Sequence, residues 1–75
     1  MKKYKHIYIV GRLPDEENSH YKYKDMTCSE AMDQFAKDLR AEDPEEYDHR
    51  FKECDGCPVI FEGVIASESP MKSLA

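Results

Sequence analysis

Two cysteines separated by two residues, Cys54 and Cys57, come closest in this chain to a chemical motif. Two thiolates at this spacing can share one tetrahedral metal ion, and dithiol redox sites use the same spacing. A structural zinc site needs two more ligands, which Cys28 and His49 could supply. We favour the simpler interpretation that both cysteines pack beside the tight Asp-Gly turn that separates them. We therefore expect no cofactor, with a small zinc-stabilised domain as the alternative.

Acidic side chains gather in one run of the chain. Residues 1–24 hold six basic and three acidic side chains, whereas the remaining residues hold five basic and thirteen acidic ones, within a net charge of −5. An acidic run suits a protein partner with a basic surface, and a solvated face is the alternative. The divided charge argues against direct nucleic-acid binding, because phosphate contacts need clustered Lys and Arg. The candidate partner-binding acids are Glu42, Asp43, Glu45, Glu46 and Asp48.

Aromatic and basic side chains accompany each other in the first third of the chain. Rings beside cations could stack on unpaired RNA bases, so an RNA-binding sheet is a further alternative. The members of this row are Tyr4, His6 and Tyr8, with Lys2, Lys3, Lys22 and Lys24 nearby. In contrast, no nucleophile elbow, phosphate-binding loop or H-E-x-x-H motif occurs, and 75 residues offer little concave surface. We expect no enzymatic activity.

An amphipathic helix from Cys28 to Arg40 is the element around which these residues must be placed. Thr27 and Glu30 form a T-x-x-E capping box at its start. Apolar residues spaced three or four apart then form one stripe along it. The residues of the stripe are Cys28, Ala31, Met32, Phe35, Ala36 and Leu39. One such helix needs one apolar sheet face to cover.

Strands and a second helix flank this helix in the sequence. Alternating segments at Lys3–Arg12 and His20–Met26 predict a hairpin. A short second helix is expected at 44–54, because the segment starts with proline and two glutamates. The last strand, Val59–Ser67, is apolar on both faces, which predicts a central or doubly covered position. Strict alternation would set Val59, Phe61 and Ile65 on one face and Ile60, Val64 and Ala66 on the other.

The resulting order, β-β-α-(α)-β, predicts an α+β fold with a small three-stranded, largely antiparallel sheet and the helices on one face. Residues 1–67 form the single domain and residues 68–75 a tail. The other sheet face stays open and is a candidate surface for a partner or for a homodimer. The candidate binding residues there are Tyr4, Tyr8 and Tyr23.

Targeting segments are not expected. The apolar run from Ile7 to Val10 is too short for the hydrophobic core of a signal peptide, and no stretch approaches the length of a membrane span. We therefore expect a cytoplasmic protein whose three cysteines are reduced.

In element order, size and charge, the chain resembles small accessory proteins of bacteriophages and mobile elements, including anti-CRISPR inhibitors of CRISPR–Cas complexes. The resemblance covers about Lys3 to Ser67. It implies a non-enzymatic interaction module that binds and blocks a host nucleic-acid-handling complex. The acidic run from Glu42 to Asp48 would face the Lys/Arg surface of such a target, although the basic first strand pair departs from a pure nucleic-acid mimic.

Overall fold

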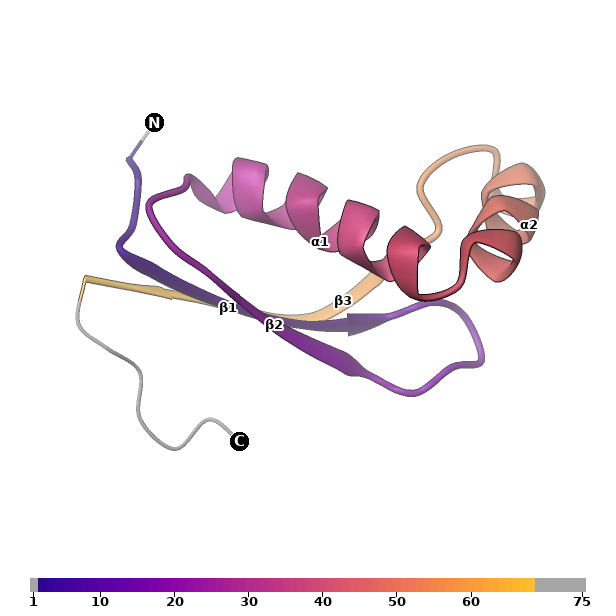
Figure 1. Cartoon of the computed structure of the whole chain (residues 1–75), viewed down its shortest axis with the longest axis horizontal. Helices are drawn as coiled ribbons and strands as arrows, with labels where there is room; N and C mark the ends of the chain where they lie inside the picture. The colour runs from indigo at the N-terminus through magenta and orange to yellow at the C-terminus, as the bar shows by residue number, and fades with distance from the viewer. Residues whose placement is uncertain (1, 69–75) are drawn as a thin grey trace.

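The computed structural model describes residues 2–68, which form three strands and two helices (Figure 1). In chain order these are β1 (His6–Arg12), β2 (Ser19–Tyr23), α1 (Cys28–Glu42), α2 (Pro44–Cys54) and β3 (Ile60–Ser67). The predicted α+β fold is confirmed, and so is the second helix. The tail expected at 68–75 lies outside the described residues, apart from Glu68.

The sheet is antiparallel throughout and has the strand order β2-β1-β3. β1 pairs with β2 as a hairpin, with Ile7 opposite Tyr23 and Ile9 opposite Tyr21. β3 returns to the other side of β1, where Ala66 lies opposite Ile7. The prediction that the last strand is central is wrong, because β1 is the central strand and β3 lies at an edge.

A β-bulge interrupts the pairing of β1 with β3. Val10 lies opposite Gly63, but the next residue, Gly11, lies opposite Phe61. Glu62 is therefore an extra residue on the β3 side. Because successive side chains of a strand point to opposite faces, one extra residue exchanges the faces of all residues beyond it.

The bulge determines which side chains of β3 face the helix. Phe61 and Ala66 both pack against the core, and Val64 shares their face because it lies opposite Ile9. Ile65, opposite Tyr8, points to the other face. The strict alternation that grouped Phe61 with Ile65 is therefore wrong, since it allowed for no extra residue.

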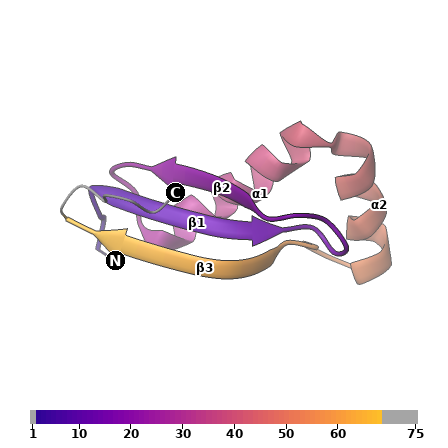
Figure 2. The ribbon, with the colours of Figure 1, turned by 90° about the horizontal axis from the view of Figure 1, so that it is seen from below.

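Helix α1 covers one face of the sheet, mainly over β1 and β2 (Figures 1 and 2). The predicted capping box is confirmed: the Glu30 backbone N–H donates to the Thr27 hydroxyl at 3.1 Å, and the Thr27 N–H donates to the Glu30 carboxylate at 2.9 Å. The apolar stripe of α1 is buried against the central strand. The core consists of Ile7, Ile9, Leu13, Tyr23, Ala31, Phe35, Leu39 and Tyr47.

The fully buried Phe35 ring lies directly against the backbone of β1 at Gly11. A methyl group at this glycine would lie 2.9 Å from the ring and 2.7 Å from the Ile60 carbonyl oxygen. Both distances are shorter than van der Waals contact allows, so only glycine fits where the helix approaches the bulge.

Helix α2 lies beyond the end of the sheet, next to the loop between β1 and β2 (Figure 1). Asp43 ends α1 and also caps α2, where its side chain accepts the N–H of Glu46 at 3.3 Å. Pro44 follows as the first helical residue, and Tyr47 joins α2 to the core. Within residues 2–68 neither helix is long and apolar enough to cross a bilayer.

The Gly11→Ala substitution should lower the free energy of unfolding by about 1–3 kcal/mol, because the added methyl group overpacks the contact between Phe35 and β1. Gly63→Ala is the matched control, since a methyl group there meets nothing within 4 Å. Urea denaturation of both variants makes the comparison. Equal stability of the two variants would contradict the close approach of α1 to β1.

Candidate interaction surfaces

An acidic surface forms where the β1–β2 loop meets the junction of α1 and α2. Partial burial, followed by the nearby carboxylates of Asp43 and Glu46, raises the pKa of Glu16 above its usual value. A loop acid and the helix-junction acids, about 27–30 residues apart in the chain, thus repel each other across a short distance. We define the acidic end as Glu16, Glu42, Asp43, Glu45, Glu46 and Asp48.

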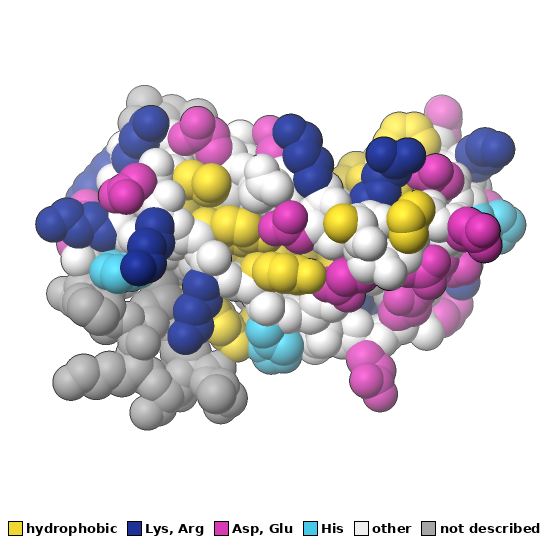
Figure 3. Space-filling model, in the orientation of Figure 1, with side chains coloured by type: hydrophobic (Ala, Val, Ile, Leu, Met, Phe, Trp, Pro, Cys, Tyr) yellow, Lys and Arg dark blue, Asp and Glu magenta, His cyan; other side chains and the backbone are white. Residues whose placement is uncertain are grey.

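Figure 3 shows acidic side chains gathered at the end of the molecule where α2 lies, whereas several basic side chains lie toward the other end. Five of the six residues of the acidic end were predicted from the sequence. Glu16 was missed, because it belongs to the basic part of the chain and only the fold carries it to the helix junction. No local sequence pattern could have placed it there.

Arginines compensate part of this charge. The Arg40 guanidinium binds both carboxylate oxygens of Asp48, at 3.0 and 3.3 Å, and these bonds hold the pKa of Asp48 below its usual value. Arg50 binds Glu46 at 2.7 Å. Two acids of the predicted run, Asp48 and Glu46, are therefore paired with a base. The i,i+4 spacing of Glu46 and Arg50 could have revealed one of these pairs, but the pair across the junction could not be recognised in this way.

Hydrogen bonds also tie the end of α1 to β2. Glu42 accepts hydrogen bonds from the hydroxyl groups of Ser19, at 3.1 Å, and Tyr21. The bond from Tyr21 is the main cause that raises the pKa of this tyrosine to about 12. Within the described part of the chain, Glu45 is the one predicted acid for which the structure shows no such partner. Glu42, Asp43 and Asp48 thus have polar partners while remaining exposed, and Glu46 is half-buried.

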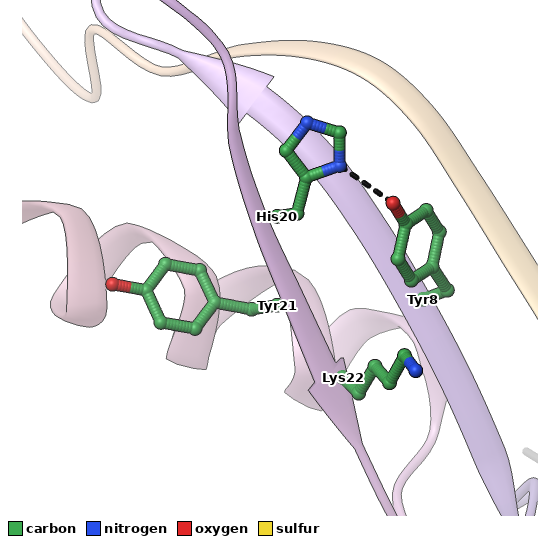
Figure 4. A pocket seen from close by; sticks show the side chains of 4 residues that line it. All are labelled: Tyr8, His20, Tyr21 and Lys22. Atoms are coloured by element: carbon green, nitrogen blue, oxygen red, sulfur yellow. Dashed lines mark hydrogen bonds between the residues drawn. The ribbon is translucent and has the colours of Figure 1, made fainter. Parts of the chain in front are cut away.

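The sheet face opposite the helices carries Tyr8, His20 and Lys22, which point to one side of the hairpin while Tyr21 points toward α1 (Figure 4). The Tyr8 hydroxyl lies 2.5 Å from Nδ1 of His20. These four residues line a hollow of 570 Å³. Tyr8 is only 6% exposed, so its ring is not available as a stacking platform.

The two other predicted surface tyrosines lie elsewhere. Tyr23 faces α1, is 9% exposed, and its hydroxyl donates to Asp38 at 2.5 Å. Burial and this bond raise the pKa of Tyr23. Tyr4 pairs with Met26 and packs against the core. The expectation that Tyr4, Tyr8 and Tyr23 share the open face is therefore wrong. The predicted RNA-binding row also lacks accessible rings at Tyr4 and Tyr8, because Tyr4 packs against the core and Tyr8 is buried.

The four candidate zinc ligands are not brought together. Cys28 lies in the first turn of α1, whereas Cys54 ends α2 at the far side of the molecule (Figure 1). His49 binds Glu53 at 3.3 Å. The exposed Cys57 accepts a hydrogen bond from the Tyr47 hydroxyl at 3.9 Å. Among residues 2–68 no group of three or more His, Cys, Asp or Glu side chains is placed to hold a metal ion.

No family model, curated protein or solved structure matches this chain. Its surfaces are therefore the basis on which a function can be assigned.

Replacing Cys54 and Cys57 together by Ser should lower the free energy of unfolding by no more than about 1–2 kcal/mol, because both thiols are exposed. Thermal unfolding of the native protein should not change when EDTA is added. Stoichiometric zinc in elemental mass spectrometry, together with unfolding in the chelator, would overturn this expectation and support the zinc-stabilised domain.

Glu16→Gln should stabilise the protein at neutral pH. A pKa raised by folding means that protonated Glu16 favours the folded state, and this contribution is lost as the pH rises through the folded-state pKa. The glutamine side chain stays uncharged at every pH, so the variant keeps this stability. Its gain in free energy of unfolding over the native protein should be largest near pH 7, shrink with added salt, and vanish at roughly pH 3. The exposed Asp33, in Asp33→Asn, provides the control. Denaturant titrations showing no gain for Glu16→Gln over this control would contradict the crowding of carboxylates.

Proposed function

We propose that this protein is a non-enzymatic interaction module whose acidic end binds a basic surface of a protein partner. The most specific form of the proposal is a phage-type inhibitor that blocks a host nucleic-acid-handling complex in the cytoplasm, as anti-CRISPR proteins do. The observation that carries the proposal is the contact between the β1–β2 loop and α2, where Arg50 lies 3.6 Å from Asp15 and 2.7 Å from Glu46. This contact brings Glu16 close enough to Asp43 and Glu46 for their charges to contribute to its raised pKa.

Electrostatics favour a basic partner for such a surface. After desolvation, repulsion by Asp43 and Glu46 is the next cause that raises the pKa of Glu16. This repulsion is unfavourable in the free protein, and cations of a partner would relieve it. The arginine contacts to Asp48 and Glu46 keep two carboxylates in fixed positions, so little side-chain freedom is lost on binding. Complementary charge acts mainly on the association rate and weakens as salt screens it.

The geometry supports an interaction module better than the other function classes. The hollow beside Tyr8 is lined by two tyrosines, a histidine and a lysine, and the described residues that line it include no carboxylate and no thiol that could act as a nucleophile. An RNA-binding sheet needs accessible rings, and the ring on this face is buried. A protein partner requires only an exposed, complementary surface.

The experiment uses two charge reversals that change the net charge equally. Glu16→Lys reverses a residue of the acidic end, and Asp33→Lys reverses an exposed acid on α1. Each protein is immobilised and exposed to a nuclease-treated bacterial lysate. We expect the native protein and Asp33→Lys to capture the same nucleic-acid-binding protein, and Glu16→Lys to lose it. Added duplex DNA should compete with the capture.

Circular dichroism shows whether both variants keep the native fold. Surface plasmon resonance at two salt concentrations then measures the association rate of the captured protein. Identical capture by both variants, or an association rate that does not depend on salt, would contradict a function of the acidic end.

A further inference from the structure

β1 pairs with one edge of β3, and the outer edge of β3 has no partner strand among residues 2–68. Native proteins usually protect such an edge with charged residues, proline or a covering element. The opposite edge strand, β2, carries the exposed Lys22 and is followed by Lys24. Between Ile60 and Ser67, in contrast, the one charged side chain is Glu62, and Arg12 binds it at 3.1 Å. The bulge at Glu62 protects the first part of the β3 edge, but from Gly63 to Ala66 the strand has no charged residue comparable to the lysines of β2.

Apolar side chains are exposed on both sides of this edge. Val64, on the helix side, is 37% exposed, because α1 lies mainly over β1 and β2 (Figure 2). Ile65, on the opposite side, is 47% exposed. Gly63 lies between Glu62 and Val64, and a methyl group there would meet nothing within 4 Å. The edge from Gly63 to Ala66 thus combines a strand side that pairs with no other described strand with two uncovered aliphatic side chains and room beside Gly63.

We propose that a second copy of this chain pairs with β3, so that two sheets join into one antiparallel six-stranded sheet. A two-fold axis at Val64 sets this residue opposite Val64 of the second copy. Ile65 then lies opposite Gly63 of the second copy, where there is room for its side chain. The edge is self-complementary in this register, as a two-fold interface requires.

Charge favours the antiparallel arrangement and a second copy as the partner. The acidic end lies beside α2, near the start of β3 (Figures 2 and 3), whereas Lys2 lies at the end of β3, where it binds Glu68 at 3.3 Å. Antiparallel copies keep the two acidic ends apart, whereas parallel copies would place two acidic ends together. A basic partner would find no uncompensated acid on β3, since Arg12 neutralises Glu62.

This interface does not use the acidic end and goes beyond the proposed function. Pairing of one eight-residue strand buries less than the about 1,600 Å² of a standard stable interface, so the dimer should depend on protein concentration. The six-stranded sheet leaves both acidic ends exposed at its two ends. Loss of partner capture in Glu16→Lys should therefore leave the dimer unchanged, which separates the two proposals.

Sedimentation velocity over a range of concentrations tests the dimer with a matched pair of variants. Ile65→Lys and Phe51→Lys each replace an apolar side chain that is 47% exposed by a lysine, but Phe51 lies on α2. We expect the native protein and Phe51→Lys to dimerise, and Ile65→Lys to associate at least about tenfold more weakly. A native protein that stays monomeric at about 1 mM overturns the proposal, as does an equal effect of the two variants.

Cross-linking tests the register and does not depend on the folding of Ile65→Lys. In a background in which the three native cysteines are replaced by Ser, Val64→Cys should form a disulfide-linked dimer on oxidation, because opposite residues of paired strands lie within disulfide distance. Lys22→Cys, on the other edge strand, should stay monomeric. Equal cross-linking of both variants, or none in Val64→Cys, overturns the proposed pairing.

Discussion

The contact of Phe35 with Gly11 is the constraint on which the arrangement of this small protein depends. A domain with one main helix must bury that helix against one sheet face, and glycine lets the ring reach the backbone of the central strand. The bulge at Glu62 turns Phe61 toward the same ring, whose centroid lies 5.6 Å away. The helix is thereby held mainly over β1 and β2, which leaves β3 partly uncovered.

The same placement of α1 creates the acidic end. The helix ends at Glu42, beside the start of β2, and the shared cap at Asp43 turns the chain directly into α2. Both features lie beside the β1–β2 loop, so Glu16 meets the helix-junction acids. Carboxylate repulsion is a real cost in a domain of this size, which has only a few kcal/mol of stability. Arginine pairs and capping bonds limit that cost without removing the surface charge.

Local signals predicted the elements well, and long-range geometry explains the failures. The capping box at Thr27 and the stripe through Phe35 identify α1 from neighbouring residues alone. A single extra residue at Glu62 reversed the predicted faces of β3. The adjacent Gly63 is the one local signal of this bulge, because an isolated glycine within a strand often marks one. The five acids near the helix junction were recognisable as a run, whereas Glu16 joins them only through the fold. Tyr23 was assigned to the open face, because alternation alone does not tell which face the helix covers.

Carboxyl titration by NMR tests the central claim, that folding converts two separate acidic segments into one surface. Carbon-13 chemical shifts of the side-chain carboxyl groups report each pKa in the native protein. The structure predicts that the pKa of Glu16 lies above the usual value of a glutamate, because of burial and the neighbouring acids, and that the pKa of Asp48 lies below the usual value of an aspartate, because of Arg40. A pKa of Glu16 at or below the usual glutamate value would show that the loop does not meet the helix junction, and would contradict the acidic end as a surface of the folded protein.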